Sequence, residues 1–190
     1  MKKTILSTVS LALVLLTGCV ALSVYPYYTT RDLIFDPALV GVWAEPADTD
    51  ANSETWTFEK INAQAYQLTI GDKDKETKFE ARLFKLKSYT FLDCLPTDGC
   101  DYSSPCHVLL RVDSIQPTLG MRPIDAEWLT DLIGKNPKAI RHSINTRANE
   151  KGNDSKDFVL TADTAELQKF ILKHIKNEDA WGKPIEMEKR

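Results

Sequence analysis

The chain has 190 residues, of which 43% are hydrophobic and 27% are charged, and its formal net charge is −3. This composition supplies enough apolar material for one folded domain and excludes an intrinsically disordered chain. Basic residues are scattered among acidic ones without forming a basic stripe, so no nucleic acid partner is predicted.

The first nineteen residues indicate export and lipidation. Lys2 and Lys3 precede an apolar stretch from Ile5 to Leu16, which is too short to span a bilayer and has the flanks of a secretory signal. The next residues, Leu16-Thr17-Gly18-Cys19, resemble the lipobox of bacterial lipoproteins. The resemblance implies that 1–18 are removed and that Cys19 carries a diacylglyceryl group and a further acyl chain such as palmitate. A plain secretory peptide or an uncleaved anchor helix is the alternative.

Two or three acyl chains hold a protein on a bilayer almost permanently, so the predicted partner is the membrane. Val20 follows the cysteine where the sorting of Gram-negative lipoproteins uses Asp for retention at the inner membrane. The resemblance therefore implies the outer membrane, facing the periplasm. Residues 19–35 show no helical or strand period and predict a lipidated N-terminus and a tether, with a linker packed partly on the domain as the alternative. The single domain is expected at 36–180, followed by an irregular tail at 181–190.

The body of the domain predicts short strands separated by turn signals. The strands are expected at 55–59, 66–70, 78–83, 89–94, 107–113 and 118–123. Short connections allow only antiparallel neighbours, so the strands form a meander. A meander of this length closes into a barrel, which removes exposed edges. The predicted fold class is mainly β, with an antiparallel barrel and two helices.

The two helices are predicted in the second half of the chain. Asp125 is a good N-cap for a helix that ends at Gly134, and a second helix begins at 161–163. A further hairpin is expected between them, from 139–145 and 157–161. The helices are expected to cover an opening or a wall of the barrel, with an α+β sandwich as the alternative.

A Gly-x-Trp motif ends the segment Phe35-Asp36-Pro37-Ala38-Leu39-Val40-Gly41-Val42-Trp43, and an acidic and an apolar residue precede it in the chain. The segment resembles the first-strand motif of lipocalins and related calycin barrels. In that family the Trp closes the base of the barrel beneath a basic side chain from a late strand, and the Gly lets the chain pass close. The resemblance implies this role for Gly41 and Trp43, with Arg141 as the basic partner. An ordinary core aromatic is the alternative, and the second lipocalin motif, Thr-Asp-Tyr, is absent from the sequence.

Three cysteines remain once Cys19 is acylated, so an oxidising compartment predicts one disulfide and one leftover thiol. If the flanking strands form a hairpin with Cys94 opposite Cys106, these two pair and Cys100 is left over at the tip. A disulfide that closes a loop of this size is worth about 3 kcal/mol. The two other pairings of three thiols stay open.

The same register places Asp93 opposite His107. An acid–base site and a structural hydrogen bond are two interpretations of this pair, and no nucleophile is linked to it by a recognisable motif. Zinc held by the three thiols and His107 is a further alternative, but the spacing is unlike that of structural zinc sites. No metal or other cofactor is therefore predicted.

No phosphate loop, zinc-protease helix or nucleophile elbow occurs in the sequence, so no enzymatic activity is predicted. Two functions stay open for a membrane-anchored envelope lipoprotein. In one, the lipocalin-like barrel holds a small apolar ligand; in the other, the barrel is solid and the domain binds another envelope protein. The sequence identifies neither the ligand nor the residues that would bind it.

Overall fold

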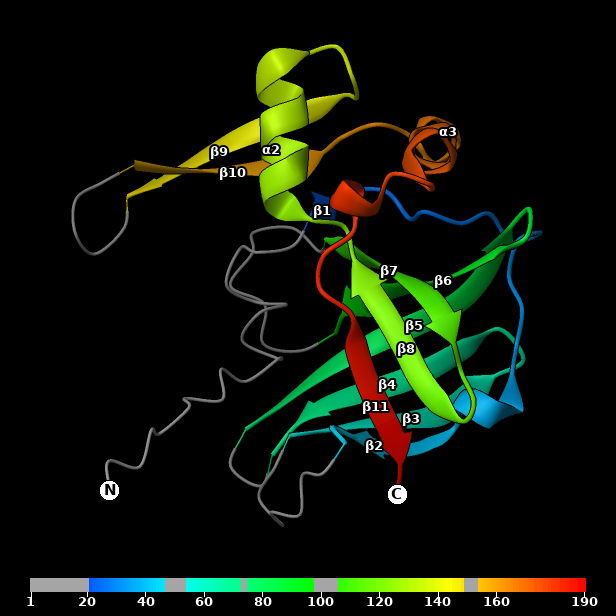
Figure 1. Ribbon diagram of the computed structural model, residues 1–190. Coiled ribbons are helices and arrows are strands. Elements are labelled where there is room, and N and C mark those ends of the chain that lie inside the picture. Colours follow the sequence, from blue (N-terminus) through cyan, green and yellow to red (C-terminus); the bar gives the residue numbers. More distant parts are fainter. Residues whose placement is uncertain (1–20, 47–53, 73–74, 98–105, 149–153) are drawn as a thin grey trace, which may run out of the picture.

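The computed structural model describes residues 21–46, 54–72, 75–97, 106–148 and 154–190 (Figure 1). In these ranges the strands are β1 (Leu22–Ser23), β2 (Gly41–Ala44), β3 (Thr55–Asn62), β4 (Ala65–Gly71), β5 (Glu76–Leu86), β6 (Tyr89–Pro96), β7 (His107–Ser114), β8 (Thr118–Pro123), β9 (His142–Ala148), β10 (Asp154–Leu160) and β11 (Ile185–Lys189). The helices are α2 (Ala126–Lys135) and α3 (Thr164–His174), with short 3₁₀ turns η1 (Pro37–Leu39) and η2 (Glu178–Ala180).

Eight of these strands close into an antiparallel barrel. β2 to β8 pair in chain order, and β11 lies between β2 and β8 so that the ring is complete. The predicted fold, a mainly β antiparallel barrel with two helices, is confirmed. The remaining strands extend the sheet from β7 in the order β1, β10, β9.

The prediction of an irregular tail at 181–190 is wrong. This segment contains β11, in which Ile185 and Met187 are buried in the barrel core while Glu186 and Glu188 are exposed. Ile185 pairs with Met121 of β8 across the closing seam. A strand with only two apolar positions and three charged ones carries a weak sequence signal, and its place between two partner strands decides its structure.

The predicted tether at 19–35 is also built into the body from Ala21 onward. β1 pairs antiparallel with β7 and parallel with β10, and Tyr27 is completely buried. Leu33 forms a bridge with Phe84 on β5. The alternative of a segment packed on the domain is therefore confirmed, and the domain begins at residue 21 rather than at 36.

Side chains of the barrel strands fill the barrel interior. Four aromatic residues among them, Trp43, Trp56, Phe58 and Tyr66, have no exposed surface. The rings of Trp56 and Phe58 lie 6.4 Å apart, and those of Phe58 and Tyr66 meet edge to face at 6.3 Å. Alternation on β3 directs these rings inward, because successive strand residues face opposite sides of a sheet.

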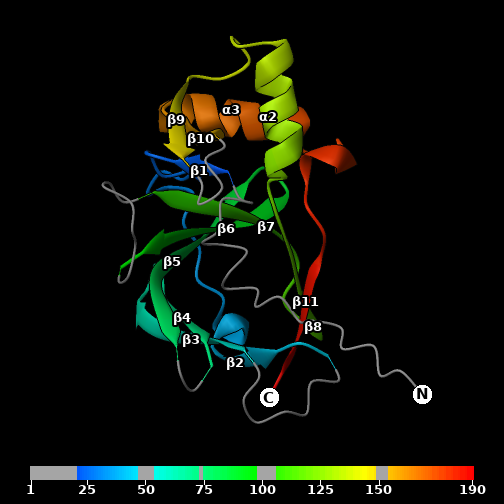
Figure 2. The same ribbon diagram turned by 90° about the vertical axis from the view of Figure 1, so that its left-hand side faces the viewer.

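A second apolar core lies on the outer wall of the barrel. Outward-facing residues of β5, β6 and β7 pack there against the buried faces of α2 and α3. The shared residues include Phe84, Phe91, Leu109, Leu129, Ile133, Leu167, Phe170 and Ile171. Figure 2 shows both helices and the β9–β10 hairpin stacked on the side of the barrel formed by β6 and β7. The helices thus cover a wall of the barrel.

The two helices begin at the predicted caps. Asp125 accepts a hydrogen bond from the N–H of Trp128 at 2.7 Å, and Asp163 accepts one from the N–H of Glu166 at 3.0 Å. Gly134 lies within the last turn of α2 instead of beyond its end, so the helix ends later in the chain than predicted. No helix in the described ranges has the length and apolarity needed to cross a membrane.

Candidate functional site

Trp43 lies at the end of the barrel where the first and last barrel strands meet. It pairs with Trp56 on β3 and with Lys189 on β11. Its Nε1 donates to the carbonyl oxygen of Leu39 in η1 at 2.8 Å. The Nζ of Lys189 lies 5.3 Å from the Trp43 ring centroid and donates to the carbonyl oxygen of Ala38 at 3.0 Å. Trp43 and Lys189 therefore tie η1 to both closing strands.

Gly41 leaves the space that this arrangement needs. Its φ is +137°, and a Cβ atom there would lie 2.6 Å from the Cε of Lys189. The basic side chain above Trp43 is Lys189, so the prediction of Arg141 is wrong. Arg141 is 57% exposed and forms ion pairs with Asp163 and Glu166. The alternation of apolar and charged residues over 185–189 was the sequence signal that could have placed Lys189 on a strand.

Asp93 and His107 meet on the outer side of the barrel, beneath β1. The Oδ1 of Asp93 lies 2.6 Å from the Nδ1 of His107, and its Oδ2 accepts a hydrogen bond from the N–H of Tyr27 at 2.9 Å. Asp93 is 1% exposed and His107 is 9% exposed. Burial, followed by the nearby Asp93 carboxylate, raises the pKa of Tyr27 far above its ordinary value.

The predicted register of this hairpin is wrong by two residues. Cys94 pairs with Val108 and Asp93 pairs with Leu109. A shift of two keeps every side chain on its predicted face, so Asp93 and His107 still meet as diagonal neighbours.

Ser23 completes a Ser, His and Asp trio on this face. It pairs directly with His107 across β1 and β7. Its hydroxyl donates to the carbonyl oxygen of Tyr25 at 2.9 Å and accepts from the N–H of Tyr25 at 3.3 Å. Ser23 has no exposed surface, so no substrate can reach its hydroxyl in this conformation. Asp93 and His107 connect β6 to β7 through their side chains, whereas Ser23 joins β1 to β7 through backbone pairing. Sequence reasoning missed Ser23 because it fell in the predicted tether.

Cys94 and Cys106 are both buried in the barrel core. They form no disulfide with each other, because the register places Cys94 opposite Val108. Burial raises the pKa of the Cys94 thiol well above its ordinary value, which makes it a poor nucleophile. Cys100 and the predicted lipidation site Cys19 lie outside the described residues. The described part of the chain holds no group of three side chains suited to a metal ion.

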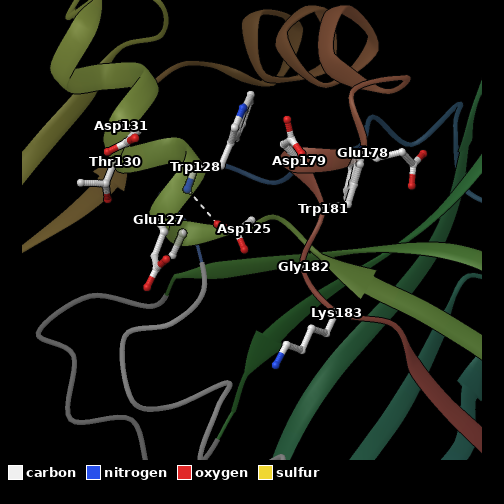
Figure 3. A pocket seen from close by; sticks show the side chains of 11 residues that line it. Asp125, Glu127, Trp128, Thr130, Asp131, Glu178, Asp179, Trp181, Gly182 and Lys183 are labelled. Carbon is white, nitrogen blue, oxygen red and sulfur yellow. Dashed lines mark hydrogen bonds between the residues drawn. The ribbon is translucent and has the colours of Figure 1, made fainter.

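A groove of about 1010 Å³ opens between the start of α2 and η2 (Figure 3). Figure 3 shows Glu127, Trp128 and Asp131 on α2, and Asp179 and Trp181 on the neighbouring segment around η2. Most of the ionisable groups that line the groove are carboxylates, and Lys183 is the cation among them. The groove therefore offers a mainly acidic surface on the outside of the barrel, with Trp128 as its partly exposed aromatic residue.

Two further hollows also lie outside the barrel core. One of about 320 Å³ is bordered by Lys138, Arg141, Lys169 and Lys173, between α3 and the loop before β9. The other, of about 500 Å³, lies beside Lys189 at the base of the barrel. The hollow at the base is bordered by Trp43 of the barrel core as well as by Lys189.

Comparison with protein-family models, with curated proteins and with solved structures finds no match for this chain. The structure itself defines a closed eight-stranded antiparallel barrel with a cap of strands and helices on one wall. Its base is closed by a first-strand Trp beneath a last-strand Lys.

Proposed function

We propose that this protein is a cell-envelope lipoprotein, anchored through Cys19, whose solid barrel supports contacts with another envelope protein. The packed barrel interior carries this proposal. A pocket for a small ligand needs about 300 Å³ or more. The buried aromatic and aliphatic side chains of the described barrel strands support an interior that is filled by the barrel itself. Lipocalin-like carriage of an apolar ligand is therefore the less favoured use of the barrel.

The lipobox supports the anchor, and Val20 after Cys19 supports an outer-membrane location. Replacing Cys19 with Ala is expected to leave the precursor uncleaved or to release the domain into the soluble fraction. Fractionation and intact-mass measurement test this expectation. Unchanged membrane partition together with an unchanged mass would contradict the lipoprotein assignment.

The barrel is tested with the mature protein extracted from its own membrane. Native mass spectrometry is expected to show the acylated chain without an additional stoichiometric small molecule. Titration with a fatty acid is expected to show no saturable binding. One bound lipid per chain, together with saturable fatty acid binding, would contradict the solid barrel and favour a ligand carrier instead.

The groove beside α2 is the surface that the proposal assigns to a protein partner. Its carboxylates and the partly exposed indole of Trp128 suit a segment with basic and aromatic residues. A photo-crosslinking residue at Asp131 is expected to capture a discrete partner in intact cells, whereas one at Ile61 on the barrel is not. Equal capture at both positions would show that the groove is not a specific interface.

A further inference from the structure

We infer that the β9–β10 hairpin is the part of this protein that lies against the bilayer, an inference that rests on the proposed anchor at Cys19. The occupant of this face is the lipid headgroup layer of the membrane that holds the anchor. The argument uses the length of chain before β1, the direction in which the chain runs into β1, and the charge of the hairpin.

Very few residues separate the proposed anchor at Cys19 from the folded domain, which begins at Ala21. Ala21 is 4% exposed and Leu22 already pairs with two strands, so only Val20 separates Cys19 from the folded body. A fully extended chain gains at most about 3.6 Å per residue, so the Cα atoms of Cys19 and Ala21 are at most about 7 Å apart. The body therefore rests directly on the membrane.

The pairing of β1 fixes which side of the body faces the membrane. β1 runs parallel to β10, with Leu22 opposite Val159 and Ser23 opposite Leu160. The chain therefore approaches β1 from the same side as β10, which is the side on which the hairpin projects in Figure 1. β10 begins at Asp154, five residues before Val159, so the hairpin reaches about 17 Å beyond the start of β1 at about 3.4 Å per residue.

The charge of the hairpin fits this position. The strands β9 and β10 together contain two basic and two acidic residues, so these strands are neutral. Without Lys2 and Lys3 the chain as a whole has more acidic than basic residues and is net negative. Anionic headgroups repel acidic surface, so a neutral element beside the anchor lets the acidic remainder face away from the bilayer.

The hairpin offers an exposed apolar residue for a direct test. Ile144 on β9 is 51% exposed and pairs with Phe158, which precedes the β10 partner of Leu22. Two strand spacings place it about 10 Å from Ala21. Ile61 on β3 is a matched control, because it is also 51% exposed. β3 is four strands from β7 in both directions around the barrel, so it lies opposite the attachment of β1.

The experiment uses the full lipidated chain with Ile144→Cys or Ile61→Cys, each labelled with an environment-sensitive fluorophore and placed in vesicles that contain a headgroup-nitroxide lipid. Quenching is expected to be several-fold stronger at position 144 than at position 61. Equal quenching, or stronger quenching at 61, would overturn the inference. The unmodified chain, carried through the same labelling, measures the contribution of native thiols.

Both labelled variants are also prepared with Cys19→Ala. If this change abolishes vesicle binding while the lipidated chains show no preference for position 144, the anchor stands and the hairpin inference alone fails. If Cys19→Ala leaves vesicle binding unchanged, the anchor in the proposed function fails instead.

Discussion

Replacing Trp43 with Ala tests whether the base of the barrel is a structural closure. The change removes a completely buried indole, the hydrogen bond to Leu39 and the contact with Lys189. Lys189 keeps its own hydrogen bond to Ala38, so η1 loses one of two connections to the closing strands. The variant should therefore lose stability without gaining or losing a ligand.

The contributions are large relative to the stability of one domain. Truncating a buried Trp costs about 3–5 kcal/mol, because it removes apolar contacts and leaves a cavity. The unpaired carbonyl of Leu39 adds about 1 kcal/mol, and the lost cation–π contact adds about 0.5 kcal/mol. The total is about 5 kcal/mol, which is a large part of the free energy of unfolding of a domain. For a chain of this length the Tm should fall by about 10–20 °C.

Thermal and urea denaturation of residues 21–190 measure this loss. Trp43→Phe is the matched variant, since it keeps an aromatic ring but cannot donate to Leu39, and it should cost only about 1–2 kcal/mol. A Tm for Trp43→Ala within about 3 °C of the parent would refute the structural closure. Loss of a binding activity with unchanged stability would place Trp43 in a ligand pocket.

The remaining predictions concern the second core and the buried thiol. Asp93→Ala removes the acceptor for both Tyr27 and His107 and should lower the free energy of unfolding by about 2–5 kcal/mol, whereas Asp93→Asn keeps one acceptor and should cost less in the same urea titration. Cys94 should resist alkylation in the folded domain and react on unfolding, as followed by mass spectrometry; fast alkylation in the native state would show that its burial is wrong. Burial, followed by the charge of a neighbouring lysine, lowers the pKa of His174 below 6.5, so the folded state disfavours its protonation. Stability should decline as the pH falls below about 6.5, and His174→Gln should flatten that decline in denaturation series between about pH 7.5 and 5; an identical slope in the variant would contradict the assignment.

The sequence predicted those parts of the fold that depend on local pattern. The alternation of Trp56 and Phe58 set the strand and its inward face, and Asp125 marked the start of a helix, because caps and periodicity act over a few residues. Gly41 and Trp43 indicated the barrel base through their resemblance to the first-strand motif of lipocalins. The strand β11 was missed because only two of its residues are apolar, and its structure comes from partners more than sixty residues away.

In the candidate site too, the features that depend on local pattern were predicted and those that depend on distant strands were not. Asp93 and His107 were predicted on a shared face, since side-chain alternation survives a register shift of two. Ser23 could not be predicted as their neighbour, because β1 has only two residues and forms by insertion between β7 and β10. Lys189 could not be paired with Trp43 until the last strand was known to return to the first.

The closing role of β11 has a consequence for how this protein is made. β2 lies near the start of the chain and β11 at its very end, so the edge of β2 has no partner on one side until the last residues have emerged. Contacts this distant in sequence form slowly. For the exported lipoprotein that we propose, this delay keeps the barrel incomplete until β11 has also crossed the membrane. A product that ends before residue 185 would expose the edges of β2 and β8 and be prone to pair with other chains.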